Sequence, residues 1–346
     1  MTAPNPPFVT RTLPYGEAAI AEAAALIAAG QPVAVPTETV YGLAADATES
    51  AAVARIYAAK GRPSFNPLIV HVLDLAAAER IAVFDEDARA LAAAFWPGPL
   101  TLVLPLRADA GIAALVTAGL DTIAIRVPAH RAMRALLEAS GTPLAAPSAN
   151  ASGGISPTRA NHVVASIGGR IALVIDDGAT EAGLESTIVQ GREVLRPGPI
   201  TAAQLTLHFQ PGESGGPVAN GSEDSETRDS DRPAPGPRRS PGWKAGDEPR
   251  ITAPGQLASH YAPSKPLRLN ATDAADGEYL IGFGGISGDE TLSPTADPVE
   301  AAANLFDALH RADASNRASI AIAPIPQDGI GTAINDRLRR AAHPIR

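Results

Sequence analysis

The chain has 346 residues, enough for about two domains, and it contains no cysteine. The absence of cysteine excludes disulfide scaffolds, Cys-ligated zinc, iron–sulfur clusters and thiol catalysis. With 28 Lys and Arg against 37 Asp and Glu, the net charge of −9 argues against broad, non-specific nucleic-acid binding. No apolar run approaches the ~18 residues of a membrane span, and the N-terminus has no apolar core typical of a secretory signal. We therefore expect a cytoplasmic protein without a membrane partner.

Helix and strand signals alternate over the first 210 residues. A helix is predicted over Ser50–Lys60, because apolar residues share one of its faces and Gly61 and Pro63 follow it. Further helices are predicted at 85–95 and 130–139, strands at 33–35, 67–72, 100–104, 122–127 and 173–175, and a hairpin at 186–189 and 193–196. This mixture predicts an α/β fold with α+β character, built on a mixed sheet rather than a purely parallel one.

Residues 212–250 differ sharply in composition from the rest of the chain. They contain seven Gly, six Pro and five Ser, and only Val218 and Trp243 represent the larger apolar residues. Such a stretch cannot bury enough apolar surface to offset its chain entropy. We therefore predict a catalytic domain over 1–210, a disordered or low-complexity linker over 211–256 and a C-terminal domain over 257–346.

The C-terminal domain has a simple alternating pattern. Strands are predicted at 267–269, 279–283 and 319–323, and helices at 299–311 and 334–342. This spacing predicts a small Rossmann-like unit of three layers.

No segment gives a complete cofactor motif. Gly282–Ser287 follows a predicted strand, but Ser287 replaces the third glycine of a dinucleotide fingerprint. Gly212–Gly216 fits the G-x-S-x-G pattern of a nucleophile elbow without a strand before it. A Walker A sequence is absent, and the seven His are scattered without metal-ligand spacing. We expect no redox cofactor and no metal-binding side chains. If the protein binds ATP, it does so without a Walker A motif.

Polar side chains come directly after one predicted strand and lie within another, from where they can converge on one cleft. Thr37 and Thr39 follow the strand at 33–35, although a polar turn that caps a helix is the simpler explanation of these two residues alone. In the strand at 122–127, alternation places Thr122 and Arg126 on one face. An arginine between apolar neighbours needs an anionic partner, which is either a ligand or a buried protein carboxylate.

Lys60 and Arg62 come shortly before Asn66 and His71. Two cations with amide donors are suited to hold a phosphate group. Lys60 by itself is also explained by its place in the last turn of a helix, where a cation favours the helix dipole. That explanation does not account for the other three residues.

A second polar group lies around residues 146–156. Small residues and glycines there allow backbone N–H groups to approach an anion, with Ser148, Asn150 and Ser156 as candidate partners. An ordinary Ser/Gly loop explains the same pattern equally well. Ser186 adds a hydroxyl and Arg196 another cation, so that the whole set suits an anionic ligand of nucleotide size.

The segments PTETVYGL, K-x-R, NPLIVHV, TIAIRVP, APSAN and ESTIV resemble, in this order, the YrdC-like family of L-threonylcarbamoyladenylate synthases. Ser259–Pro263 and Leu280–Phe283 resemble the additional C-terminal domain of its two-domain members. The resemblance implies a twisted mixed-sheet YrdC-like domain with a concave, positively charged cleft, and a small Rossmann-like three-layer C-terminal domain. It also implies that the segment joining the two domains crosses the cleft.

The family resemblance implies an activity. Such enzymes combine L-threonine, bicarbonate or CO2 and ATP with Mg²⁺ into threonylcarbamoyl-AMP and pyrophosphate. A tRNA threonylcarbamoyl-transfer complex then uses the product to form N6-threonylcarbamoyladenosine (t6A) at position 37 of tRNAs that read ANN codons. A weak contact with RNA is a further implied interaction. Either bulk solvent or His71 could remove the proton from the threonine amine.

The resemblance also implies roles for single residues. It assigns catalysis to Lys60, Arg62 and Arg126. It assigns the binding of L-threonine to Thr37, Thr39, His71, Arg126, Ala146 and Ser186. It assigns the binding of ATP to Lys60, Arg62, Asn66, Thr122, Ser148, Asn150, Ser156, Arg196 and Tyr261.

Two other classes compete with a synthase. An RNA-binding module without turnover would use a basic concave surface, but the net charge and the few aromatic residues argue against it. A carbamoyl-transfer module of the related kind would carry zinc-finger segments, which a chain without cysteine cannot form. The sequence leaves open the oligomeric state, the purpose of the 212–250 insertion and the task of the C-terminal domain.

Overall fold

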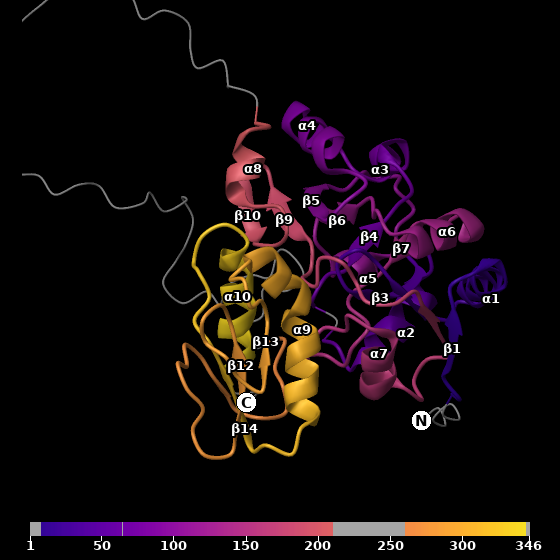
Figure 1. Cartoon of the computed structure of the whole chain (residues 1–346). Coiled ribbons are helices and arrows are strands. Elements are labelled where there is room, and N and C mark those ends of the chain that lie inside the picture. The colour runs from indigo at the N-terminus through magenta and orange to yellow at the C-terminus, as the bar shows by residue number, and fades with distance from the viewer. Residues whose placement is uncertain (1–7, 64, 210–259, 344–346) are drawn as a thin grey trace, which may run out of the picture. The chain divides into compact units, whose positions relative to one another are not determined.

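The computed structural model describes residues 8–63, 65–209 and 260–343 (Figure 1). Within them, the N-terminal part is built on a ten-stranded sheet. Its strands are β1 (Arg11–Pro14), β2 (Val33–Pro36), β3 (Tyr41–Asp46), β4 (Ile69–His71), β5 (Leu100–Pro105), β6 (Thr122–Arg126), β7 (Leu144–Ala145), β8 (Leu173–Asp176), β9 (Thr187–Gln190) and β10 (Glu193–Arg196).

The order of these strands is β1-β8-β2-β3-β7-β4-β6-β5-β9-β10. The sheet contains both parallel pairs, such as β4 with β6, and antiparallel pairs, such as β5 with β6. The expectation of a mixed α/β sheet is therefore confirmed. The predicted hairpin is formed by β9 and β10, whose register shifts between Val194 and Arg196.

Eight helices accompany this sheet in the described part of the chain. They are α1 (Glu17–Ala28), α2 (Ser50–Lys60), α3 (Leu75–Ile81), α4 (Glu86–Phe95), α5 (Ala114–Thr117), α6 (Arg131–Ser140), α7 (Ala160–Ile167) and α8 (Ala202–Thr206). The α2 helix has the predicted bounds and ends at Gly61 in the left-handed conformation, which glycine adopts without strain. Asp74 and Asp85 cap α3 and α4 by accepting a backbone N–H.

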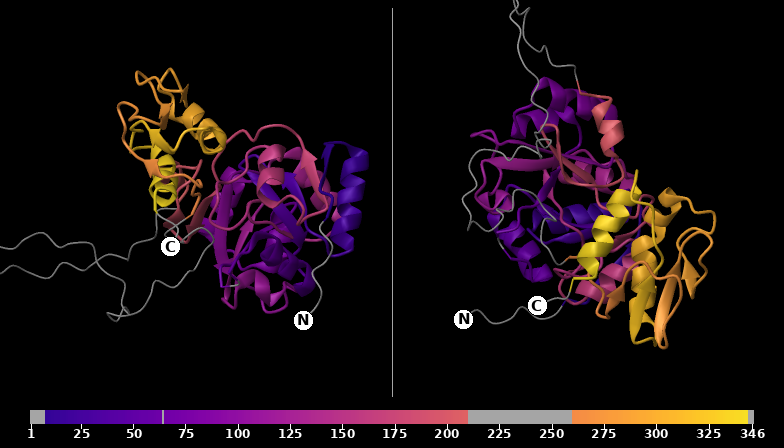
Figure 2. Two further views of the ribbon diagram at one scale, coloured as in Figure 1. Left: turned by 90° about the horizontal axis from the view of Figure 1, so that it is seen from below. Right: turned by 90° about the vertical axis from the view of Figure 1, so that its left-hand side faces the viewer.

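The sheet is covered on both faces. Successive side chains of a strand point in opposite directions, so neighbouring residues of one strand join different cores. Val33 and Val35 of β2 join a core with α1 and α6, whereas Ala34 between them joins a second core with α2 and α7. Figure 2 shows these elements from two further sides. Burial of both faces holds the strand ends in place, and the site is built at those ends.

A second, four-stranded sheet lies in the C-terminal part. It contains β11 (Leu267–Arg268), β12 (Glu278–Gly282), β13 (Glu290–Thr291) and β14 (Ser319–Ile322), with helices α9 (Pro298–Ala314) and α10 (Gly331–Ala341). The strand order is β11-β14-β12-β13 and every pair is parallel. Both helices share one buried core with Ile281 of β12 and with Ile320 and Ile322 of β14, whereas Leu280 and Ala321 belong to a separate, smaller cluster.

The predicted linker at 211–256 lies outside the described residues. The described residues before and after it belong to one compact unit. The domain boundaries at 210 and 257 therefore stay a prediction. In the described part of the chain, no helix has the length and apolar character needed to cross a membrane.

Candidate functional site

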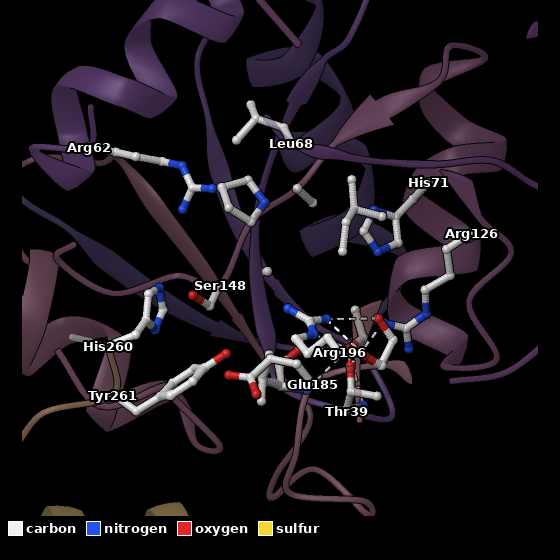
Figure 3. Close-up of a pocket in the computed structure, with 17 residues that line it drawn as sticks. Thr39, Arg62, Leu68, His71, Arg126, Ser148, Glu185, Arg196, His260 and Tyr261 are labelled. Atoms are coloured by element: carbon white, nitrogen blue, oxygen red, sulfur yellow. Dashed lines mark hydrogen bonds between the residues drawn. The ribbon is translucent and has the colours of Figure 1, made fainter. Parts of the chain in front are cut away.

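A pocket lies where the turn after β2, the carboxyl ends of β4 and β6, and the start of β9 meet. Ten of the predicted site residues line it (Figure 3): Thr37, Thr39, Arg62, His71, Arg126, Ala146, Ser148, Ser186, Arg196 and Tyr261. Segments far apart in the sequence thus converge on one cavity, as the polar stretches predict. Charged side chains that line a cavity need either a ligand or a protein partner.

Arg126 lines one end of the pocket and is held there by three protein groups. Its Nη2 donates to Oε1 of Glu38 at 2.5 Å, its Nη1 to Oγ1 of Thr39 at 3.0 Å and its Nε to the carbonyl of Gly98 at 3.1 Å. Burial raises the pKa of Glu38, but the charge and hydrogen bond of Arg126 outweigh it and keep that pKa below its usual value. The guanidinium therefore faces the pocket in a fixed orientation with its charge balanced.

His71 lies beside Arg126, because β4 and β6 pair with these two residues in register. The imidazole is buried, and its Nδ1 has no hydrogen-bond partner. Burial, and next the positive charge of Arg126, lower the pKa of His71 to about 3. His71 is thus a neutral ring that can hydrogen-bond to a ligand, and it is a poor proton acceptor.

Arg62 and Arg196 add two more buried cations to the pocket. Arg62 donates to the carbonyls of Asn66 and Pro67, and burial lowers its pKa to about 10, so it stays charged at neutral pH. Arg196 donates to the carbonyl and to the hydroxyl of Ser186 at 2.9 and 3.1 Å. Two fixed guanidinium groups in one cavity are suited to an anion such as phosphate.

The lining also contains residues that sequence reasoning did not assign to the site. Glu185 and His260 line the pocket directly, and Glu38 holds Arg126 from behind. Each is the immediate neighbour of a residue that was assigned, and that adjacency was the available signal. Arg337, whose Nε donates to Oε2 of Glu185 at 2.8 Å, had no such signal because it lies 152 positions away.

Five predicted site residues do not line the pocket. They are Lys60, Asn66, Thr122, Asn150 and Ser156. Thr122 begins β6, whereas Arg126 ends it, so the two lie at opposite ends of the strand. Ser156 donates to Glu185 and thus supports the lining from outside. The amide of Asn66 is fully buried, with neither of its polar atoms hydrogen-bonded, which is typical of a group that awaits a ligand or water.

Lys60 is buried under the loop that carries Ser148. Its Nζ donates to the carbonyls of Ser148 and Asn150, both at 2.5 Å, and burial lowers its pKa well below the usual value. Asn150 in turn donates from Nδ2 to the carbonyls of Ala151 and Gly154. In this structure the two side chains fix the loop, and their predicted contact with ATP stays a prediction.

The described residues offer no cluster of three or more His, Asp or Glu side chains that could bind a metal ion. The carboxylate that lines the pocket, Glu185, is already engaged by Ser156 and Arg337. The arrangement therefore combines cationic and hydroxyl groups without a protein-built metal centre among those residues.

Two sequence profiles match the chain. One, described as telomere recombination, matches residues 25–198, and the other, described as the C-terminal domain of threonylcarbamoyl-AMP synthase, matches residues 226–343. The first match ends before the segment of shifted composition at 212–250, whereas the second begins within it.

Proteins of known name resemble the chain over nearly its whole length. The threonylcarbamoyl-AMP synthase of Bacillus subtilis is 38% identical and covers 96% of each chain. That of Pyrococcus abyssi is 36% identical over 92% of this chain and 93% of its own. The crystal structure of P. abyssi Sua5 complexed with L-threonine superposes with a TM-score of 0.78 at 35% identity, over 96% of this chain and 97% of that one.

Proposed function

The chain belongs to the family of threonylcarbamoyl-AMP synthases, which form an adenylate from ATP, and we propose how its pocket performs that reaction. L-threonine, bicarbonate or CO2 and ATP are converted to threonylcarbamoyl-AMP and pyrophosphate. The observation that carries the proposal is one cavity lined by three arginines, Arg126, Arg62 and Arg196, together with a neutral His71 beside Arg126. Such a cavity accepts an amino-acid carboxylate and a polyphosphate together.

L-threonine occupies the end of the pocket at Arg126. The guanidinium faces the threonine carboxylate, and its orientation is fixed by Glu38 and Thr39. The free Nδ1 of His71 offers a hydrogen bond to the hydroxyl or to the carbamate of the substrate. The structure of the P. abyssi protein in complex with L-threonine supports this amino acid as the ligand.

The nucleotide occupies the end of the pocket at Arg62 and Tyr261. Arg62 and Arg196 remain charged in the buried cavity and attract the phosphates. Tyr261 and Ser148 complete the wall on that side. The loop that carries Ser148 is held by Lys60 and Asn150, and the Glu185 carboxylate is held by Ser156. The side-chain amide of Asn66, which has no hydrogen-bond partner, is available to the nucleotide.

The reaction needs no covalent protein intermediate. The threonine amine attacks CO2, and a carbamate oxygen then attacks the α-phosphorus and displaces pyrophosphate. The chain contributes orientation and fixed positive charge around the phosphoryl group. Because the pKa of His71 is about 3, that ring is too weak a base for an ammonium group, and solvent removes the proton.

Magnesium enters with ATP as part of the substrate. The pocket carboxylate is occupied by other side chains, and the described residues offer no acidic cluster of their own. Mg²⁺ is commonly bound through substrate phosphates rather than by an all-protein cage. The ion then neutralises charge on the triphosphate.

The product serves a second step in the cytoplasm. The threonylcarbamoyl group passes through a tRNA threonylcarbamoyl-transfer complex to position 37 of tRNAs that read ANN codons and forms t6A there. A weak contact with RNA accompanies the transfer. A tRNA modification assay with the matching transfer proteins tests this part separately from adenylate formation.

Pyrophosphate release from ATP tests the adenylation step. We expect release that depends on both L-threonine and bicarbonate and that is lost in Arg126→Ala. The control is Arg89→Ala, which removes an exposed arginine paired with Glu79 and should keep full activity. A folded wild-type protein that releases no pyrophosphate in response to threonine would contradict the proposal.

A further inference from the structure

Helix α10 of the C-terminal part places one arginine against the pocket wall. Arg337 is completely buried. Its Nε donates to Oε2 of Glu185 at 2.8 Å, and its Nη1 donates to the carbonyl of Pro197 at 2.8 Å and to Asp336 at 3.0 Å. Its guanidinium also lies 5.2 Å from the centre of the Tyr261 ring. Arg337 thus touches two residues that line the pocket without lining it itself.

Glu185 is an unexpected residue in a cavity for a polyanion. Its carboxylate is buried, and it lies close to Tyr261 and Arg196 in the close-up (Figure 3). An isolated buried carboxylate would repel a triphosphate strongly, because the protein interior screens charge poorly. One oxygen of this carboxylate accepts from Ser156 and the other from Arg337, so neither is left without a partner.

Groups from several elements face this carboxylate. Arg337 comes from α10, Arg196 from β10, and Tyr261 and Ser156 from loops, while Asp336 accepts from Arg337 rather than facing the carboxylate. Burial raises the pKa of Glu185, and the charges of Arg337 and then Arg196 lower it, so the acid is ionised at neutral pH. In the proposed function, Arg196 binds the phosphates of ATP. Arg337 is therefore the cation that can balance the charge of Glu185 without being needed by the nucleotide.

We propose that Arg337 is a positioning residue for the ATP site, which neutralises Glu185 and holds it away from the phosphates so that Arg196 remains available to the nucleotide. This inference rests on the proposed function, because it concerns the same ATP-binding end. It assigns a chemical task to the C-terminal part of the chain, which carries α10. A purely structural ion pair between two domains is the competing explanation.

Steady-state kinetics separates the two explanations. We expect Arg337→Met to raise the KM for ATP by about tenfold or more, since loss of one partner leaves a buried charge unpaired. The KM for L-threonine should change little, because Arg126 and His71 are untouched. The double variant Glu185→Gln with Arg337→Met should recover most of the lost ATP affinity, and Arg337→Lys should keep part of it. The control Arg339→Met removes an exposed arginine from the same helix.

The pH dependence gives a second readout that a structural role would not produce. In Arg337→Met the Glu185 carboxylate loses its main counter-charge, so its pKa should rise. The ratio of the variant's KM for ATP to that of the wild type should then fall as the pH is lowered from about 8 to 6, because the acid becomes neutral. In the double variant this ratio should not depend on pH.

Each outcome decides the question. Equal impairment of the single and double variants, or an unchanged KM for ATP in Arg337→Met, would overturn the proposal. If Arg337→Met does not fold, the comparison of Arg337→Lys with the double variant takes its place. If the wild type shows no threonine-dependent turnover, the proposed function fails. Direct calorimetric titration with ATP still tests Arg337 in that case.

Discussion

Glu38 and Arg126 form a buried ion pair at the threonine end of the pocket, with Nη2 of the arginine 2.5 Å from Oε1 of the glutamate. The other carboxylate oxygen accepts from the backbone N–H groups of Ala129 and His130, at the start of α6. The glutamate thereby links the turn after β2 to the end of β6. It fixes the direction of the guanidinium before any substrate is present.

The first prediction concerns this pair. Glu38→Gln keeps the shape of the side chain but removes the negative charge, so that Arg126 is left buried with an unbalanced charge. We expect a loss of about 3 kcal/mol in the free energy of unfolding and a higher KM for L-threonine. Urea denaturation and threonine titration measure the two effects. Glu79→Gln, which removes the exposed partner of Arg89, should cost less than about 1 kcal/mol; equal losses in both variants would contradict the assigned role.

The second prediction concerns Lys60. Lys60→Met leaves the carbonyls of Ser148 and Asn150 without a donor in a buried place. We expect a loss of about 1–3 kcal/mol in the free energy of unfolding, together with a lower kcat because the loop carrying Ser148 shifts. If Lys60 instead acts only by binding phosphate directly, the KM for ATP would rise while the stability stayed constant.

The third prediction concerns Gly198, which lies against the strand that carries the site. A Cβ atom at this position would lie 2.5 Å from the backbone N of Thr187 and 2.7 Å from the carbonyl O of Glu185. We expect Gly198→Ala to destabilise the protein by about 1–3 kcal/mol and to displace Glu185 and Ser186, with a loss of activity. Thermal unfolding measures the first effect. Gly16→Ala is the matched control, because the added methyl group meets no atom within 4 Å.

The fourth prediction concerns stability in acid. Burial lowers the pKa of His71 to about 3 and that of His310 to about 4, whereas both have the ordinary value of 6.5 in the unfolded chain. Between these values the unfolded state binds more protons, so the free energy of unfolding falls as the pH drops below 6.5. The slope is up to about 1.4 kcal/mol per pH unit for each histidine.

Chemical denaturation at about pH 7, 6 and 5 measures this slope. The lowered pKa values of Glu38 and Glu185 add a further loss only below their ordinary value of 4.5, so the histidines dominate the chosen range. His310→Gln removes one of the groups that take up a proton on unfolding. Its slope should be shallower than that of the wild type, and an identical slope would refute the assignment.

Local sequence patterns determined much of the fold. The apolar face of Ser50–Lys60 and the glycine after it predict a helix with the observed bounds. Both signals lie within one short segment of the sequence, because a helix repeats every 3.6 residues. The α1 helix was not predicted from the sequence. Its twelve residues include seven alanines, so polar and apolar faces are hard to distinguish, and packing against α6 and β2 defines its buried side.

The candidate site shows the same difference between what the sequence predicts and what the tertiary structure decides. The sequence by itself identified the polar segments at strand ends, and with them the threonines, the cations and the histidine that line the pocket. Only the tertiary structure decided which charges meet: Lys60 binds loop carbonyls, Arg126 binds Glu38, and Arg337 reaches Glu185. The reason is physical. A backbone pattern depends on residues within a few positions, whereas the partner of a buried charge depends on which distant segments fold against it.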